Sequence, residues 1–203
     1  MLDLFGAMTS LSATLLFITV NRNAWLITLV ATLLNGYLYA QKGIYADMLL
    51  EVAFFASAFY GWFNWRNTAT HKPVEITNLS SPRHWLTLLS TLVLLYSFLT
   101  WFLSTYTHSN VASLDAITST LCLIAQWLTC RKIIISWILW LLTDLIYAYL
   151  YYIKDLPFHS SLAIFYTILA VVGYLNWQKI QKSHKKPLSF GLNTIISPPL
   201  KQF

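Results

Sequence analysis

Polar and aromatic side chains recur at helical spacing inside apolar segments of this 203-residue chain. In residues 133–153 they follow one another at steps of three and four, which puts them on one face of a helix: Trp137, Trp140, Asp144, Tyr147 and Tyr151. Indole faces stack on flat rings and attract positive charge, and a carboxylate supplies a counter-charge. This face predicts recognition of a flat, polar and cationic molecule.

Three other apolar segments carry a comparable polar seam. Residues 111–130 contain Asp115, Ser119, Cys122, Gln126 and Thr129 at this spacing. Residues 24–40 contain Trp25, Thr28, Thr32, Asn35 and Tyr39, and residues 44–65 contain Asp47 and Glu51. Polar groups inside hydrocarbon are costly, so those in the middle of a segment are functional candidates. The predicted substrate-binding residues are Trp137, Trp140, Asp144, Tyr147, Gln126, Glu51 and Asn35.

Some of these residue types also have purely structural interpretations. Trp25 and Trp137 lie near the ends of their segments, where tryptophan often anchors a helix at the membrane interface. Gly61 and Gly173 are expected to be close-packing positions between helices rather than binding groups. Cys122 and Cys130, eight residues apart on one segment, are too far apart to bridge and are expected to be small apolar fillers.

The composition predicts a membrane protein. Hydrophobic residues make up 57% of the chain and charged residues only 10%, against about 25% charged in a soluble domain. Each apolar segment has roughly the 17–25 residues that a membrane-spanning helix needs. The seven predicted spans are Leu2–Val20, Ala24–Ala40, Ile44–Trp65, His84–Leu103, Val111–Cys130, Ile133–Ile153 and Phe158–Gln178.

The basic residues predict the orientation of these spans. With the amino terminus outside, eleven Lys and Arg fall on the inner side, whereas Lys42 and Lys154 alone fall on the outer side. The carboxyl terminus is then cytoplasmic. The net charge of +6 is thereby explained by topology and implies no nucleic-acid partner.

A duplication organises the chain. Trp25 recurs as Trp137, and the trio Gly61, Asn64 and Trp65 recurs as Gly173, Asn176 and Trp177, always 112 positions later. A constant offset across three successive segments indicates a repeated unit. Residues 1–65 form the first three-helix repeat, 66–110 a linker and connecting helix, 111–178 the second repeat, and 179–203 a basic tail expected to be disordered. Because one extra helix separates the triplets, they are parallel, as in one class of transporters.

Other functional classes fit the sequence poorly. The five histidines fall in loops or at segment ends without metal-ligand spacing. A retinal protein needs a lysine within its last helix, and residues 158–177 contain none. A membrane-embedded enzyme stays a remote alternative, and no cofactor is expected.

The chain resembles the PnuC family of vitamin transporters over roughly residues 1–180. The resemblance is carried by IYADMLLEVAFFASAFYGWFNW (44–65), by LDAITSTLCLIAQWLTCRKIIISWILW (114–140) and by the Trp-x-x-Trp-x-x-x-Asp run that ends at Asp144. It implies a seven-helix, three-plus-one-plus-three fold similar to the SWEET sugar transporters. It also implies uptake of nicotinamide riboside by facilitated diffusion, with phosphorylation inside the cell trapping the substrate, and a place in the bacterial inner membrane.

Two departures from the family pattern leave the substrate open. Asp144 stands where riboside-carrying members usually have Asn, and Glu51 stands where they often have Gln. The change adds negative charge, which suits a cationic substrate. Since thiamine is also cationic and the family includes thiamine carriers, thiamine is the alternative substrate. The sequence leaves open a homo-oligomer and proton coupling.

Overall fold

The computed structural model describes residues 2–41, 45–66, 75–106, 112–153 and 157–185. These residues form seven helices: α1 (Leu2–Ile18), α2 (Asn23–Gln41), α3 (Tyr45–Arg66), α4 (Pro82–Tyr106), α5 (Ala112–Cys130), α6 (Ser136–Ile153) and α7 (Pro157–Lys185). The predicted all-α, seven-helix fold is confirmed. The outer-loop lysines Lys42 and Lys154, linker residues 67–74 and tail residues 186–203 lie outside the described part.

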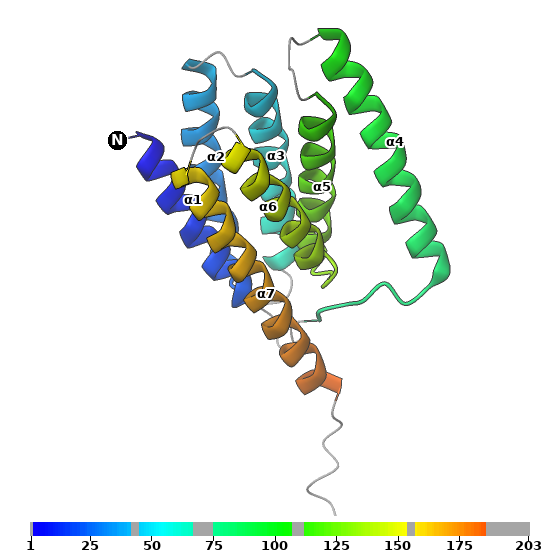
Figure 1. Ribbon diagram of the computed structural model, residues 1–203. Coiled ribbons are helices and arrows are strands. Elements are labelled where there is room, and N and C mark those ends of the chain that lie inside the picture. Colours follow the sequence, from blue (N-terminus) through cyan, green and yellow to red (C-terminus); the bar gives the residue numbers. More distant parts are fainter. Residues whose placement is uncertain (1, 42–44, 67–74, 107–111, 154–156, 186–203) are drawn as a thin grey trace, which may run out of the picture.

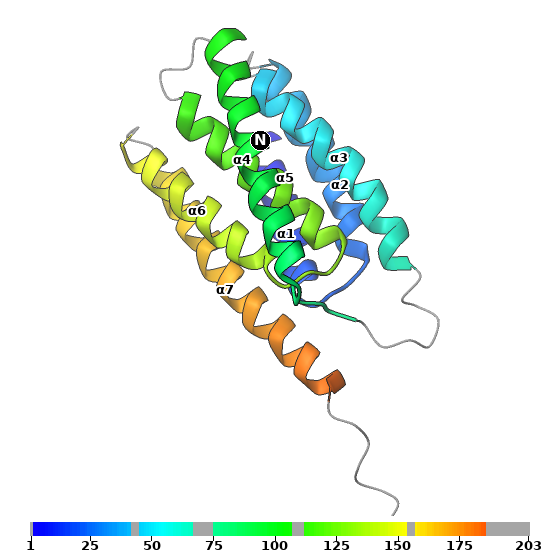
Figure 2. The same ribbon diagram turned by 90° about the vertical axis from the view of Figure 1, so that its right-hand side faces the viewer.

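The helices form two three-helix halves with α4 at one side (Figure 1). Within the halves, α2 packs on α1 and α3, and α6 packs on α5 and α7. The halves meet where α3 packs on α5 and α1 packs on α7, which is the contact pattern of a pseudo-two-fold axis. Successive helices alternate in direction, so α4 brings the second triplet back to the orientation of the first (Figure 2).

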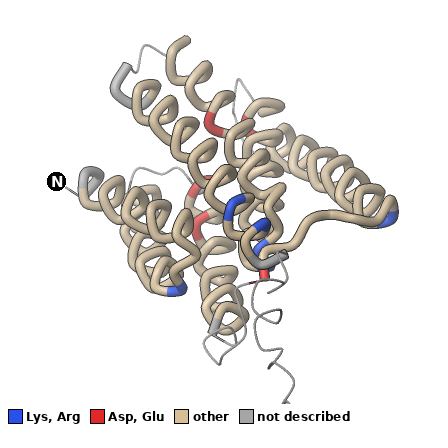
Figure 3. Tube along the Cα trace, turned by 90° about the horizontal axis from the view of Figure 1, so that it is seen from below, with Lys and Arg blue, Asp and Glu red and all other residues tan. Residues whose placement is uncertain are grey.

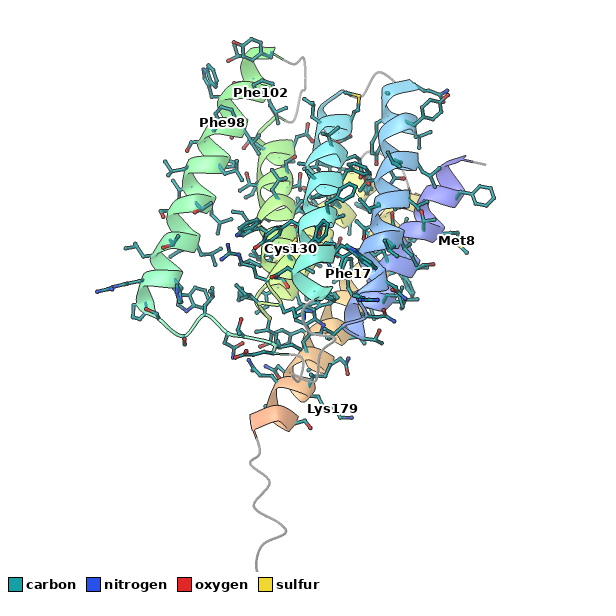
Figure 4. The ribbon with its side chains drawn as sticks, turned by 180° about the vertical axis from the view of Figure 1, so that it is seen from behind. Met8, Phe17, Phe98, Phe102, Cys130 and Lys179 are labelled. Atoms are coloured by element: carbon teal, nitrogen blue, oxygen red, sulfur yellow. The ribbon has the colours of Figure 1, made fainter. Side chains whose placement is uncertain are left out.

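Three of the described helical stretches are long and apolar enough to cross a membrane by themselves: Pro82–Tyr106, Ser136–Ile153 and Ser160–Ser183. A shorter apolar stretch covers Phe5–Ile18. Helices α2, α3 and α5 are not among these three stretches, and their apolar sequences are interrupted by the polar seams. Helix α4 is the most exposed: Phe98 and Phe102 project from it at the end away from the linker, and Phe98 is 54% exposed (Figure 4). Such a surface suits contact with lipid.

Described Lys and Arg gather at one end of the bundle, hereafter the basic end, which Figure 3 views face-on. This end carries the carboxyl termini of α1, α3, α5 and α7. Helix α7 continues to Lys185, seven residues past the predicted boundary of the tail, so residues 179–185 extend a helix instead of being disordered. The remaining ends match the predicted spans within a few residues.

Helices α1 and α5 end in the same way. Val20 and Lys132, which are 112 positions apart, both have a φ of 56°. Asn21 N donates to Leu16 O at 2.9 Å, and Ile133 N donates to Leu128 O at 3.0 Å. This is the hydrogen bond of a Schellman C-cap, here without the usual glycine in the left-handed position. The repeat therefore extends to the backbone conformation of its turns.

Each half also caps the first helix of the other half. Asn64 Nδ2 and Trp65 Nε1 on α3 donate to Cys130 O at the end of α5, at 2.7 Å and 3.0 Å. Asn176 Nδ2 on α7 donates to Ile18 O at 2.8 Å, and Trp177 Nε1 donates to Phe17 O at 3.0 Å. The last carbonyls of a helix have no partner within the helix. These crossed caps satisfy them from across the pseudo-two-fold axis.

Tryptophans fill the centre of the basic end. The four-tryptophan core consists of Trp25, Trp65, Trp137 and Trp177, all at most 4% exposed. Trp25 lies edge-on to Trp65 with ring centroids 5.4 Å apart, Trp137 lies edge-on to Trp177 at 5.5 Å, and the two pairs touch where Trp65 meets Trp177 at 6.2 Å. Trp25 and Trp137 are thus core residues, and their interpretation as interface anchors is wrong.

Two glycines make room for this core, as predicted. A Cβ on Gly61 would overlap the Trp25 indole, and a Cβ on Gly173 would lie 2.6 Å from Trp137 ring atoms. Both cysteines are free and buried, in agreement with their interpretation as fillers. The small residues thus set how closely α3 approaches α2 and how closely α7 approaches α6.

The described part of the predicted soft linker is docked on the second half. Thr77 N donates to Lys132 O and Ile134 N donates to Thr77 O, both at 3.1 Å, and Ile76 is buried in the same core. Gln181 Nε2 on α7 donates to Ile76 O at 2.9 Å. The Lys132 ammonium lies 5.1 Å from the centroid of the Trp65 ring, and burial lowers its pKa to about 8.

Candidate substrate-binding site

A cavity of about 780 Å³ lies between the two halves. All helices except α4 contribute to its wall. Its volume falls within the range of cavities that hold small molecules. Near the basic end the wall includes Phe17 and Trp137, so the four-tryptophan core lies beneath it (Figure 4 labels Phe17 inside the bundle). Toward the opposite end it includes Tyr39, Asp47 and Tyr151.

The structure brings all the predicted site residues together in this wall. Helix α6 contributes Trp137, Trp140, Asp144 and Tyr147, and the other helices contribute Gln126 (α5), Glu51 (α3) and Asn35 (α2). Residues spaced by three and four lie on one helical face, and here that face is the one turned to the other half. Their role in binding stays a prediction.

Aromatic side chains form one side of the cavity. Trp140 and Phe54 have ring centroids 6.3 Å apart and planes inclined by 59°. Trp140 Nε1 donates to Thr129 Oγ1 at 3.3 Å, which fixes the edge of the indole and leaves its face along the wall. Tyr166 from α7 lines the same cavity. Flat aromatic faces of this kind suit stacking with a heteroaromatic ring.

The described wall is acidic and not basic. Asp144, Glu51 and Asp47 line the cavity, and none of the described lining residues is Lys, Arg or His. The side chain of Asn35 hydrogen-bonds Glu51. Carboxylates in a low-dielectric wall attract cations and repel anions strongly. The site is therefore suited to a positively charged molecule.

Several residues of the wall escaped the sequence analysis. They come mainly from α1 and α7, neither of which carries a conspicuous polar seam: Ser10, Thr14, Phe17, Leu162, Ala163, Tyr166 and Ala170. The repeat contained a signal for one of them, because Tyr166 lies 112 positions after Phe54. Conversely, Trp25, Asp115, Ser119 and Cys122 belong to predicted seams but are not among the lining residues.

The two walls differ although the backbone is duplicated. Thr28 and Thr32 on α2 occupy the positions that Trp140 and Asp144 occupy on α6, again 112 residues apart. On α3 and α7 the acid belongs to the first half, since Glu51 on α3 corresponds to Ala163 on α7. The first half thus places two carboxylates in the cavity, Asp47 and Glu51 on α3, and the second half places one, Asp144 on α6. Only the second half contributes indoles to the wall.

Two parallel three-helix repeats around a polar cavity define a multi-pass membrane transporter of the parallel-repeat class. The chain belongs to the family described as nicotinamide mononucleotide transporter, whose model matches residues 1–179. It is 23% identical to the nicotinamide riboside transporters PnuC of Escherichia coli (strain K12) and Shigella flexneri, over 73% of this chain and 73% of each relative.

The fold is similar to a solved structure, the crystal structure of the vitamin B3 transporter PnuC. The TM-score is 0.74 at 23% identity, and the match covers 90% of this chain and 83% of that one. The predicted resemblance to the PnuC family is confirmed, as is the prediction of a transporter rather than an enzyme.

Proposed function

We propose that this protein carries nicotinamide riboside across the bacterial inner membrane. The observation that supports this most directly is the cavity between the halves, which combines the Trp140 and Phe54 rings with the carboxylates of Asp144 and Glu51. Nicotinamide riboside has a cationic aromatic ring, hydroxyls and a carboxamide, and each of these groups finds a chemical partner in that wall. The names of the relatives point to the same substrate.

The unphosphorylated riboside fits the wall better than the mononucleotide. A phosphate carries up to two negative charges and is normally bound by Arg, Lys or backbone N–H groups. The described part of the wall contains Asp144, Glu51 and Asp47 and no basic side chain. A phosphate inside the cavity would face these acids without compensation. Phosphorylation after entry would therefore prevent return through the same cavity, which supports trapping by an intracellular kinase.

Transport by this mechanism is facilitated diffusion. Among the described residues, the wall offers acids but no histidine with which they could form a proton relay. Uptake of radiolabelled nicotinamide riboside into proteoliposomes should stop when the inner and outer concentrations are equal and should ignore ionophores. Accumulation above the outer concentration, in vesicles without a kinase, would contradict passive transport.

The amino terminus is proposed to face the periplasm and α7 to end in the cytoplasm. The clustering of described Lys and Arg at the basic end supports this orientation. A reporter enzyme fused after Ser183 should be active only in its cytoplasmic form. Periplasmic activity at that point would reverse the orientation.

Thiamine is the second candidate substrate, because Asp144 and Glu51 replace the amides usual in riboside carriers and an aminopyrimidine pairs well with a carboxylate. Asp144→Asn discriminates the two. It should retain most of the riboside affinity, because Asn is the residue usual at this position in riboside carriers, but should weaken thiamine binding by about 1.5–3 kcal/mol, the contribution of a charged hydrogen bond. Isothermal titration of the purified protein with each compound measures both. Unchanged affinity for both compounds in Asp144→Asn and Asp144→Ala would remove Asp144 from the site.

A further inference from the structure

The hydroxyl of Ser57 lies behind Gln126, one of the residues of the cavity wall. Gln126 Nε2 donates to Ser57 Oγ at 3.1 Å, from α5 to α3. Ser57 Oγ in turn donates to Phe54 O of its own helix at 2.8 Å. A serine hydroxyl has a single hydrogen, so once that hydrogen is used, its oxygen can only accept. Ser57 therefore selects the nitrogen of the Gln126 amide and turns the amide oxygen the other way.

The amide oxygen of Gln126 opens onto the cavity. Gln126 is 6% exposed and lines the cavity. Its oxygen accepts no hydrogen bond from the residues that the structure describes. It is also absent from the described buried atoms that lack a partner, so the oxygen is accessible from the cavity. A substrate in the cavity would thus meet a hydrogen-bond acceptor at Gln126 and not the N–H donor that an amide can also present.

The same arrangement is repeated at the indole of the site. Trp140 Nε1 donates to Thr129 Oγ1, and Thr129 Oγ1 donates to Ala125 O one turn earlier at 2.8 Å. In both cases a hydroxyl that is occupied by its own helix takes up an N–H of a wall residue. These two N–H groups are thus taken up inside the protein, whereas the carboxylates of Asp144 and Glu51 present oxygen acceptors to the cavity.

We propose that Ser57 is a specificity-determining positioning residue, which acts through Gln126 to make the site favour a substrate group with N–H donors over one that only accepts. The proposal rests on the proposed function and adds to it. A carboxamide on the pyridine ring can donate to the Gln126 oxygen. A carboxylate at the same ring position would be repelled by that oxygen, because both groups carry negative charge density and neither has a hydrogen to share.

The test compares nicotinamide riboside with nicotinic acid riboside, which differ in this one group. Dissociation constants of both are measured by isothermal titration on the purified full-length protein. In the Ser57→Ala variant the Gln126 amide is free to turn its N–H₂ toward the cavity. The dissociation constant of nicotinic acid riboside divided by that of nicotinamide riboside should then fall by about two- to tenfold, as expected for one neutral hydrogen bond.

Matched controls separate this effect from loss of a helix hydroxyl. Ser97 on α4 also donates to a carbonyl of its own helix, Ser97 Oγ to Val93 O at 2.8 Å, but it is exposed and is not part of the cavity wall. Ser97→Ala should leave the ratio unchanged. Ser57→Thr, which keeps the hydroxyl, should retain the wild-type ratio. Should Ser57→Ala fail to fold, Ser57→Cys replaces it, because a thiol is a weak acceptor of similar size.

A double variant tests whether Ser57 acts through Gln126. Gln126→Leu removes the amide, so adding Ser57→Ala to it should cause no further change in the ratio. An additional loss in the double variant, or a wild-type ratio in Ser57→Ala, would overturn the proposal. If the wild-type protein binds neither riboside, the proposed function itself is overturned; if it binds nicotinamide riboside and Ser57→Ala leaves the ratio unchanged, this inference alone fails.

Discussion

At the basic end the two halves are near copies of each other, whereas around the cavity they present different side chains at equivalent positions. The crossed caps, the glycine–tryptophan contacts and the turns at Val20 and Lys132 all occur twice, 112 residues apart. In the cavity, by contrast, the first half has Thr28 at the position equivalent to Trp140 of the second half, and Thr32 at the position equivalent to Asp144.

This difference follows from what each region contacts. At the basic end the halves contact each other, so a change in one half has to fit the equivalent position of the other. In the cavity they contact a substrate that has no two-fold symmetry, and equivalent positions can carry different chemistry. Equivalent substitutions should thus have equal effects at the basic end and unequal effects in the cavity.

The largest effects are expected from the two glycines. Gly61→Ala and Gly173→Ala each place a methyl group against a buried indole that has no room to move. Each should destabilise the protein by about 3 kcal/mol, the upper part of the range for overpacking. Thermal unfolding in detergent measures both. Gly36→Ala is the control, because its Cβ would be at an ordinary 3.6 Å from Glu51, and unequal losses at Gly61 and Gly173 would break the comparison.

The next largest effect concerns substrate affinity. Trp140→Ala removes the stacking face and should weaken binding of nicotinamide riboside by about 2 kcal/mol, roughly thirtyfold, the value of a desolvated cation–π contact. Thr28→Ala, at the equivalent position of the first half, should change affinity by less than about threefold, because its hydroxyl already donates to Ala24 O. Isothermal titration of both variants with nicotinamide riboside measures these affinities. Similar losses of affinity in the two variants would show that both halves contribute equally to binding.

The crossed caps should contribute equally. Asn64→Ala and Asn176→Ala each remove one donor to a helix end, and each should cost about 1 kcal/mol of stability. Trp65 and Trp177 still donate at those ends in the variants, which limits the loss. A melting-temperature series that includes both single variants tests this expectation. A loss confined to one of them would mean that one interface between the halves dominates.

The smallest effects concern the two left-handed turns, and they sharpen the comparison. Val20→Gly relieves a β-branched residue at a φ of 56° but also removes a partly buried side chain that packs against the core, so it should stabilise the protein by no more than about 0.5 kcal/mol. Lys132→Gly gives the same backbone relief but loses the contact of the ammonium with Trp65, so its net effect should be close to zero. Equal stabilisation by both would mean that this contact contributes nothing.

Much of the fold was predictable because hydrophobic length and the repeat offset are properties of the sequence itself. They gave the seven helices, the parallel halves and the place of Gly61 and Gly173. The polar seams also identified a set of residues that the structure gathers around one cavity, since α2, α3, α6 and the carboxyl-terminal part of α5 turn polar residues of their seams into its wall.

What stayed hidden depends on contacts between distant segments. The burial of Trp25 and Trp137 arises from tryptophans of two other helices, and a position near a segment end gave no sign of it. The docking of Thr77 on Ile134 joins a polar linker to a turn more than fifty residues later. The contribution of α1 to the cavity is equally non-local, because its small residues become part of the cavity wall only when α2 and α7 pack beside them.

The crossed caps carry a consequence for how such a chain can be divided. A single three-helix half lacks the donors that complete the end of its own first helix, while its third helix holds donors that point outward for another copy. Two identical halves could satisfy each other by the same four bonds, as a symmetric homodimer does. The protein is in this sense a dimer fused into one polypeptide, and separately synthesised halves should recognise each other through their carboxyl-terminal Asn-Trp pairs.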